Sequence, residues 1–483
     1  MTSHRGGGWT WLILSVAALL LSACERERGV NPADAWKPNI ILIAADALSP
    51  SLLSAYGGPV PTPHLDRLAR EGVLFKRAYS AAAASGPARA ALISGRYPQR
   101  FGFEFDHGPA QRAADQRLGL PVEVDTIGNW MQSSGYNSYA VGLWHLGGNT
   151  EYYPTRRGFH DFYGVLSGET SYLSPRAKDH RFAATAKHPM PPARPAHHQV
   201  VRGPASQPVL NDHVYLTDAL GDAAADFVRA NGDRPFFLYL AFNAPGEPLS
   251  VTDRYYQRFS HVADEKTRIY YAMIAAMDDA IGRVLKMVDS LQKSDNTLVI
   301  FTAITGCAAE SGVCACQPLR GGRPSFFEGG VRVPLILRWP AAAPQGQTYD
   351  AMVSHLDIAP TLLMAAKPDL AVTRDSDGVD LLPYLTGVRK GEPHAALFFQ
   401  SGLSRAVISG DWKYWRQSGG DTMLFNLQSD PNEQRNQVAS HRDTVRDLDI
   451  LIEKWRSGNA PPRWTMHSKT DYDMCGTSMH LTQ

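Results

Sequence analysis

The stretch Ala81–Arg96 reads AAAASGPARAALISGR, and the rest of the chain is best interpreted outward from it. A run of small residues leads to Ser85, and Pro87 then opens a run of good helix formers. Proline suits the first turn of a helix, where its missing N–H is not needed. A helix that begins at Ser85 would turn its free N–H groups and positive dipole end toward an anion. Arg89 follows one turn later and offers a planar fork for an oxyanion. The pattern indicates an anion pocket, although an ordinary capped helix with a surface arginine has the same local chemistry.

Upstream, residues 38–46 read PNIILIAAD, a continuous apolar run that ends in Asp46. Such a run predicts a buried parallel strand, and ligand sites of α/β sheets lie at the carboxyl ends of the strands. Further strands are expected within residues 73–79, 234–245 and 296–302, and helices within 62–72, 214–231 and 264–291, from their apolar spacing and caps. The fold class predicted from these elements is α/β, with a large mixed, mostly parallel sheet sandwiched by helices.

The composition is that of an ordinary globular protein. The chain has 483 residues, of which 44% are hydrophobic and 20% charged. Its formal net charge is +1. This length suits one large domain or two. The balanced charge gives no reason to expect a nucleic-acid partner.

The N-terminus has the features of an export signal. Arg5 precedes an apolar run over residues 9–21, which is too short for a comfortable membrane span, and Leu21-Ser22-Ala23-Cys24 follows. The last four residues resemble the bacterial lipobox, in which the cysteine becomes lipidated and N-terminal. We therefore expect a lipoprotein signal peptide at 1–23, lipidation of Cys24 and a polar tether at 24–37. The predicted location is the bacterial cell envelope, lipid-anchored and facing the periplasm or the cell surface. A plain secretory signal is the alternative.

Four other cysteines remain, namely Cys307, Cys314, Cys316 and Cys475. An even number in an exported protein predicts disulfides, whose pairing the sequence does not settle. A metal site is the rival interpretation, but no histidine lies at ligand spacing beside the cluster. Residues 176–202 are rich in basic residues and proline, which indicates a solvated loop or a basic contact for an anionic glycan.

Ser85-Gly86-Pro87-Ala88-Arg89, followed by Leu92 and Gly95-Arg96, resembles the signature of the sulfatases, which belong to the alkaline-phosphatase-like superfamily. The resemblance extends from about residue 37 to about residue 455. It includes LWHLG at 143–147, PLRGGR at 318–323 and EGGVRVP at 328–334. It implies a main domain at 38–400, a small C-terminal subdomain at 401–460 with an antiparallel sheet and one helix, and a tail at 461–483. It also implies that Ser85 is oxidised to formylglycine, whose hydrate attacks sulfur beside a calcium ion.

Carried over position by position, the family pattern is only partly kept. The resemblance places Asp46 among the metal ligands, and Arg89, His145 and Arg323 beside Ser85, with Arg323 replacing a lysine. The other three metal-ligand positions and two sulfate-binding positions differ, and they are Ala47, Ile304, Thr305, Leu143 and Gly246. Calcium takes about six to eight oxygen ligands, so one carboxylate does not hold it. Without calcium, a buried Asp46 needs a raised pKa or a new partner, such as Arg89 or Arg323.

The interpretation that follows is a sulfatase-family lipoprotein that is catalytically impaired and holds an anionic ligand, such as a sulfated glycan, with no cofactor expected. The alternative is an active arylsulfatase-like sulfuric ester hydrolase that uses Ca²⁺ and formylglycine derived from Ser85. A third possibility is a hydrolase of the wider superfamily that acts on another ester. His145, although it falls on a motif position, could equally be a structural histidine.

Overall fold

The computed structural model describes residue 2 and residues 37–108, 117–168, 170–173, 177–185, 187–190, 200–204, 207–209, 214–313, 318–366, 375–417, 421–466, 469–473, 475–476 and 478–482. The expected signal peptide, the lipidation site Cys24, most of the tether, Cys314 and Cys316 therefore lie outside the described residues. Cys307 and Cys475 are both disulfide-bonded, as expected for these cysteines. Among the described helices, none combines the length and the apolar character that a membrane crossing requires.

An 11-stranded sheet organises the main part of the chain. In spatial order its strands are β12 (Gln347–Tyr349), β2 (Val73–Tyr79), β11 (Arg332–Arg338), β10 (Thr297–Ala303), β1 (Asn39–Ala45), β8 (Phe236–Ala241), β3 (Asn137–Leu143), β4 (Asp161–Val165), β6 (Val201–Arg202) and β7 (Gln207–Pro208), while β13 (Val353–Ser354) also pairs with β2. The central strand β1 is parallel to both β10 and β8, whereas β11 is antiparallel to β10 and β2. The sheet is therefore mixed and mostly parallel, as predicted.

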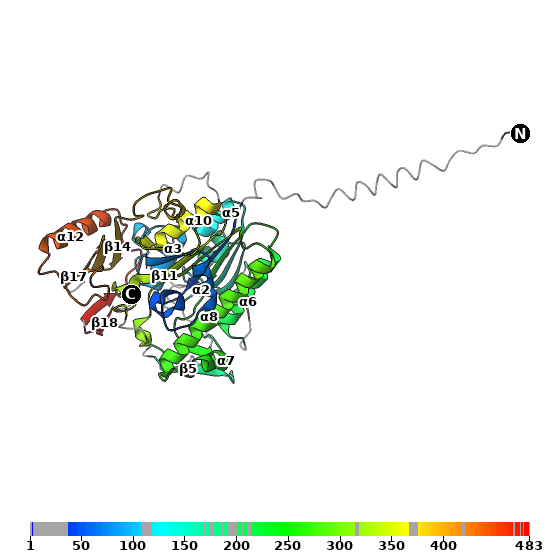
Figure 1. Ribbon diagram of the computed structural model, residues 1–483, viewed down its shortest axis with the longest axis horizontal. Helices are drawn as coiled ribbons and strands as arrows, with labels where there is room; N and C mark the ends of the chain where they lie inside the picture. The colour runs from blue at the N-terminus through cyan, green and yellow to red at the C-terminus, as the bar shows by residue number, and fades with distance from the viewer. Residues whose placement is uncertain are drawn as a thin grey trace. The chain divides into compact units, whose positions relative to one another are not determined.

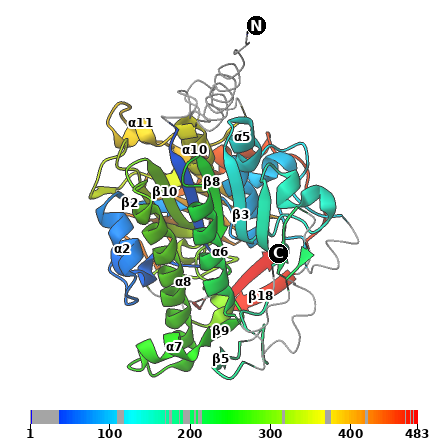
Figure 2. The same cartoon turned by 90° about the vertical axis from the view of Figure 1, so that its right-hand side faces the viewer.

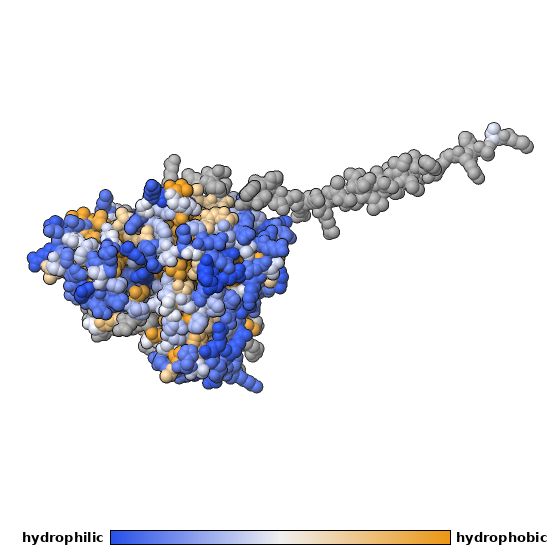
Figure 3. Space-filling model, viewed as in Figure 1, coloured by the Kyte–Doolittle hydropathy of each residue, from blue (hydrophilic) through white to orange (hydrophobic). Residues whose placement is uncertain are grey.

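Helices cover both faces of this sheet (Figures 1 and 2). The long helices α6 (Leu216–Ala230) and α8 (Glu265–Ser290) lie on one face together with α2 (Pro63–Arg70), and α3 (Ser85–Ser94), α5 (Ile127–Ser133) and α10 (Ile358–Ala366) lie on the other. Every residue of β1 is buried, which explains its unbroken apolar sequence. Figure 3 shows mainly hydrophilic residues over α2 and α8, which face solvent on their outer sides.

The parallel strands bring several chain segments to one edge of the sheet. Ala45 at the end of β1 pairs with Ala303 of β10, and Ala44 pairs with Ala241 of β8. Gly142 of β3 also pairs with Ala241. The residues that follow these four strands therefore gather at a common carboxyl edge, where a site is expected.

A second, antiparallel sheet contains β14 (Ala396–Ser401), β15 (Ser404–Ser409), β16 (Trp412–Arg416) and β17 (Thr422–Asn426), and α12 (Arg442–Arg456) packs on it. This sheet begins at Ala396, ahead of residue 401, where the sequence placed the start of the subdomain. Smaller elements are β5 (His180–Ala183) paired with β9 (Leu249–Thr252), β18 (Lys469–Asp473) paired with β19 (Ser478–Thr482), α7 (Asp253–Tyr256), α9 (Glu328–Val331) and α11 (Leu382–Leu385).

A buried group of charges joins the small sheet to α9. Lys413 of β16 is 1% exposed, and its Nζ lies 3.0 Å from Glu328 Oε1 and 2.9 Å from Glu433 Oε1. Arg332 Nη1 lies 3.2 Å from Glu328 Oε2. Burial raises the pKa of Glu433 to about 7, although Lys413 works against this shift. Lys413 is thus the cation that makes two buried carboxyl groups compatible with the interior.

We predict that Lys413→Met destabilises the protein by about 3–5 kcal/mol near neutral pH, because it leaves two buried carboxyl groups without their shared cation. The loss should be smaller at about pH 5 than at about pH 8, because a group whose pKa is raised by folding binds a proton as the pH falls. Urea unfolding at both pH values measures the effect. Arg446→Met is the control, because it breaks an exposed pair with Asp443 and should change the stability little. Equal losses for the two variants would contradict the prediction.

Candidate functional site

Asp46 stands at the carboxyl edge of the sheet, one residue beyond β1, with its carboxylate between two guanidinium groups. Its Oδ1 lies 3.4 Å from Arg89 Nη2, and its Oδ2 lies 3.5 Å from Arg323 Nη1. The exposed fractions of the three side chains are 10% for Asp46, 0% for Arg89 and 14% for Arg323. Both basic residues that the sequence offered as partners for Asp46 are therefore in place.

Ser85 is the first residue of α3, as the position of Pro87 predicts. Its Oγ receives a hydrogen bond from Arg89 Nε at 3.3 Å and lies 3.4 Å from Asp46 Oδ1. Arg89 also donates from Nη1 to the carbonyl oxygen of Leu143, at 2.8 Å. The guanidinium of Arg89 thus joins the end of β3, the end of β1 and the start of α3.

The amino end of α3 faces a carboxylate of the same chain, that of Asp106. The backbone N–H of Gly86 donates to Asp106 Oδ1 at 2.7 Å. A Cβ at position 86 would lie 2.4 Å from that oxygen, so the close approach depends on glycine. Asp106 therefore occupies one of the N–H groups that the sequence assigned to a bound anion.

His145 completes the surroundings of Ser85, with its Nδ1 3.4 Å from Ser85 Oγ. Its backbone φ is +54°, an uncommon value for a histidine. The ring of His107 meets it edge-on, with 4.7 Å between ring centroids. Burial lowers the pKa of His145 well below its ordinary value, and the charges of His107, Arg89 and Lys187 act in the same direction. The imidazole is therefore neutral at pH 7 and able to accept or donate one proton.

The positions that would complete a calcium site offer few oxygens. Ala47 and Ile304 have no side-chain oxygen, and the backbone carbonyl of Ala47 accepts a hydrogen bond from Tyr270 Oη at 2.7 Å. Thr305 Oγ1 is buried without a hydrogen-bond partner among the described residues, and so is Asn243 Oδ1. Since both oxygens of Asp46 already face guanidinium groups, the described residues fall short of the about six to eight oxygens that calcium takes.

Position 246 shows why a larger residue is excluded beside Asp46. A Cβ on Gly246 would lie 2.7 Å from Asp46 Oδ2 and 2.8 Å from the carbonyl oxygen of Asn243. Glycine allows this segment to pass close to the carboxylate. The histidine that the family resemblance implies at this position would require a different path of the chain or a different position of Asp46.

The structure thus brings together all five residues that the sequence singled out for the site: Asp46, Ser85, Arg89, His145 and Arg323. Sequence reasoning missed Asp106, His107 and Lys187. No motif marks these three residues, and they reach the site only through the paths of the segments after η3 (Pro98–Phe101) and after β5. A pair of polar residues such as Asp106 and His107 after an aromatic run was the only available signal.

Comparison with known proteins identifies the family of this chain. The sulfatase family pattern matches residues 38–368, and the pattern described as "N-sulphoglucosamine sulphohydrolase, C-terminal" matches residues 323–455. The N-acetylgalactosamine-6-sulfatase of Canis lupus familiaris is 30% identical over 84% of this chain and 76% of its own length. The N-acetylgalactosamine-6-O-sulfatase of Bacteroides thetaiotaomicron is 28% identical over 91% of this chain and 97% of its own length.

Solved structures give the same assignment. The crystal structure of Ps i-CgsB in complex with k-i-k-neocarrahexaose has a TM-score of 0.79 and 30% identity, and the match covers 89% of this chain and 94% of that chain. The fold, the motif residues around Ser85 and the matched family pattern over residues 38–368 therefore agree, and the chain belongs to the sulfatase family.

Proposed function

We propose that this chain binds an anionic ligand, such as a sulfated glycan, at the Ser85 site and is impaired in hydrolysing it. The observation that carries the proposal is the position of Asp46, whose two carboxylate oxygens face Arg89 and Arg323 at 3.4 and 3.5 Å. In this family the resemblance implies a calcium ion next to that carboxylate. Two fixed guanidinium groups can take the place of that ion as partners of the Asp46 carboxylate.

The proposed impairment of hydrolysis follows from how the positively charged side chains at the site are already used. Cleavage of a sulfate ester develops negative charge on oxygen, and fixed charges or donors aimed at that oxygen each contribute about two to three decades in rate. Arg89 directs its donors at Ser85, Asp46 and the Leu143 carbonyl. It therefore has little capacity left to stabilise the sulfuryl group during its transfer from the leaving alcohol oxygen to the attacking oxygen.

Binding makes weaker demands than catalysis. The guanidinium of Arg323 is partly exposed, and a planar guanidinium suits a sulfate oxygen pair. The neutral His145 can donate one hydrogen bond to the same ligand. The relatives named above act on or were solved with sulfated or glycan ligands, as their names state, which favours a ligand of this class. We extend the proposal to a lipid anchor at Cys24 in a bacterial cell envelope, because the lipobox resemblance favours it.

An active sulfuric ester hydrolase is the second candidate. It is favoured by Ser85 at the first position of α3, with Arg89 and His145 both within 3.5 Å of its Oγ. This candidate requires oxidation of Ser85 to formylglycine, and it requires cation ligands other than those found around Asp46.

We predict that the purified full chain, equilibrated with calcium and then desalted, retains much less than one calcium per molecule. We also predict that it turns over an aryl sulfate no faster than its Ser85→Ala variant. Elemental analysis and a chromogenic aryl-sulfate assay measure these two quantities, and the mass of the Ser85 peptide shows whether two hydrogen atoms were lost by oxidation. One equivalent of calcium that Asp46→Asn removes, together with turnover that Ser85→Ala abolishes, would establish the hydrolase instead.

We predict that Asp46→Asn strengthens binding of a sulfated glycan and that Arg323→Gln weakens it. Unit charges about 5 Å apart interact by about 1 kcal/mol in water and about 3 kcal/mol at an effective dielectric constant of 20, so each change should alter Kd by roughly five-fold to a hundred-fold. Calorimetry with a sulfated carrageenan hexasaccharide, and with its desulfated form as the ligand control, tests this. Arg446→Gln on α12 is the matched protein control. Weaker binding by Asp46→Asn would show that the carboxylate itself serves the ligand.

A further inference from the structure

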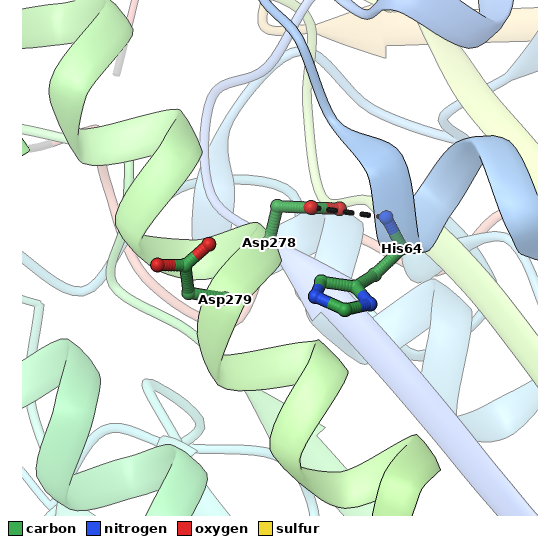
Figure 4. A group of neighbouring side chains, drawn as sticks. All are labelled: His64, Asp278 and Asp279. Carbon is green, nitrogen blue, oxygen red and sulfur yellow. Dashed lines mark hydrogen bonds between the residues drawn. The ribbon is translucent and has the colours of Figure 1, made fainter. Parts of the chain in front are cut away.

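Three potential metal ligands meet where α2 packs on α8, and none of them contacts Ser85 or Asp46. His64 lies in the first turn of α2, and Asp278 and Asp279 lie side by side on α8. One ligand atom from each residue can be chosen so that all three lie within 4.8 Å of one another. Figure 4 shows the imidazole of His64 over the turn of α8 that carries both carboxylates.

Gly282 permits this approach of the ring to the helix. A Cβ at position 282 would lie only 2.3 Å from His64 Nε2 and 2.6 Å from its Cε1. Gly282 follows Asp278 by one helical turn, on the same face of α8. The absence of a side chain there allows the imidazole to lie against the helix next to Asp278 and Asp279.

The three side chains keep uncommitted donor atoms. Within the described part of the chain, neither ring nitrogen of His64 has a hydrogen-bond partner. Asp279 pairs through Oδ2 with Arg258 Nη1 at 2.9 Å, and its Oδ1 is therefore available to a ligand. Asp278 accepts the backbone N–H groups of His64 at 3.1 Å and Leu65 at 2.9 Å, one on each oxygen. Each of these oxygens retains a lone pair, because a carboxylate has about four acceptor sites.

The charge around Asp278 is not balanced by a direct ion pair. Its side chain belongs to a residue that is 1% exposed, and no lysine or arginine of the described chain pairs with it. The two side-chain charges that act on it, those of Asp279 and Asp66, are both negative. Lys286, Arg67 and Arg258 act on His64 as positive charges, and Lys286 acts on it more strongly than Asp279 does. A compact cation between the three ligands would add a direct positive partner to the two backbone N–H groups that Asp278 already accepts.

We propose that His64, Asp278 and Asp279 bind a divalent transition-metal ion, with Zn²⁺ as the best fit, and that this ion ties the start of α2 to α8. One imidazole nitrogen and two carboxylate oxygens form a ligand set that zinc accepts, with water in the fourth position. Magnesium and calcium prefer oxygen ligands alone. Tetrahedral zinc needs its ligand atoms about 3.4 Å apart. The side chain of Asp279 is partly exposed, so it can rotate toward His64 and Asp278 and shorten the present separation, which is up to 4.8 Å.

The test uses the full chain after chelator treatment, with zinc chloride added as the only metal. We expect one equivalent of bound zinc by elemental analysis after dialysis, and a rise in Tm of about two degrees or more that depends on zinc concentration. Magnesium and calcium should produce no such rise. Cobalt in place of zinc should give the visible absorption of a low-coordinate site.

His64→Asn and Asp279→Asn should each weaken zinc binding at least ten-fold and abolish the zinc-dependent rise in Tm. Both variants keep the carboxyl group of Asp278 and the two backbone N–H groups that donate to it at the start of α2. The metal-free Tm should therefore change little. His261→Gln removes an exposed histidine outside the proposed site. It is the matched control for nonspecific zinc binding. Zinc binding by both site variants at the wild-type affinity, or no zinc-dependent change in wild-type Tm, would overturn the proposal.

Discussion

The contact of one carboxylate with two guanidinium groups governs the arrangement of this site. Asp46 is nearly buried at the carboxyl edge of the sheet, and an unpaired carboxylate in such a place costs several kcal/mol or takes up a proton. Arg89 and Arg323 stabilise the Asp46 carboxylate, each on a different oxygen. Because Arg89 also holds Ser85 Oγ and the Leu143 carbonyl, the same contact fixes the start of α3 against the ends of β1 and β3.

Two guanidinium groups and one divalent cation satisfy a carboxylate in different ways. A cation concentrates its charge in one point, accepts oxygen ligands from several directions and acidifies what it binds. A guanidinium spreads a single charge over a plane and acts through N–H groups of fixed direction. Under the proposed function, the arrangement around Asp46 would hold an anion and orient Ser85 through fixed N–H groups and not through the Lewis acidity of a cation.

The sequence predicted most of the sheet because its central strands carry strong local signals. The unbroken apolar run of β1 and the three- to four-residue spacing in α8 each match the structure to within a residue or two. The spacing of Ser85 and Arg89 also predicted their contact, since residues one turn apart on a helix are neighbours. The approach of Arg323 to Asp46 came only from the family resemblance, because no local rule relates residues so far apart.

The position of Arg323 depends on the segment that follows the strand β10. The backbone N–H of Arg323 donates to the carbonyl oxygen of Cys307 at 2.8 Å, and Cys307 is disulfide-bonded. The backbone of the arginine is thus fixed by a segment that follows β10, in which Cys307 is 1% exposed. The residues that follow β10 also pack with the core, because Ile304 and Cys307 belong to the same buried cluster as Ile40–Ile43. The absence of metal ligands that we propose at Ala47 and Ile304 is compatible with an intact sheet, because Arg89 and Arg323 reach Asp46.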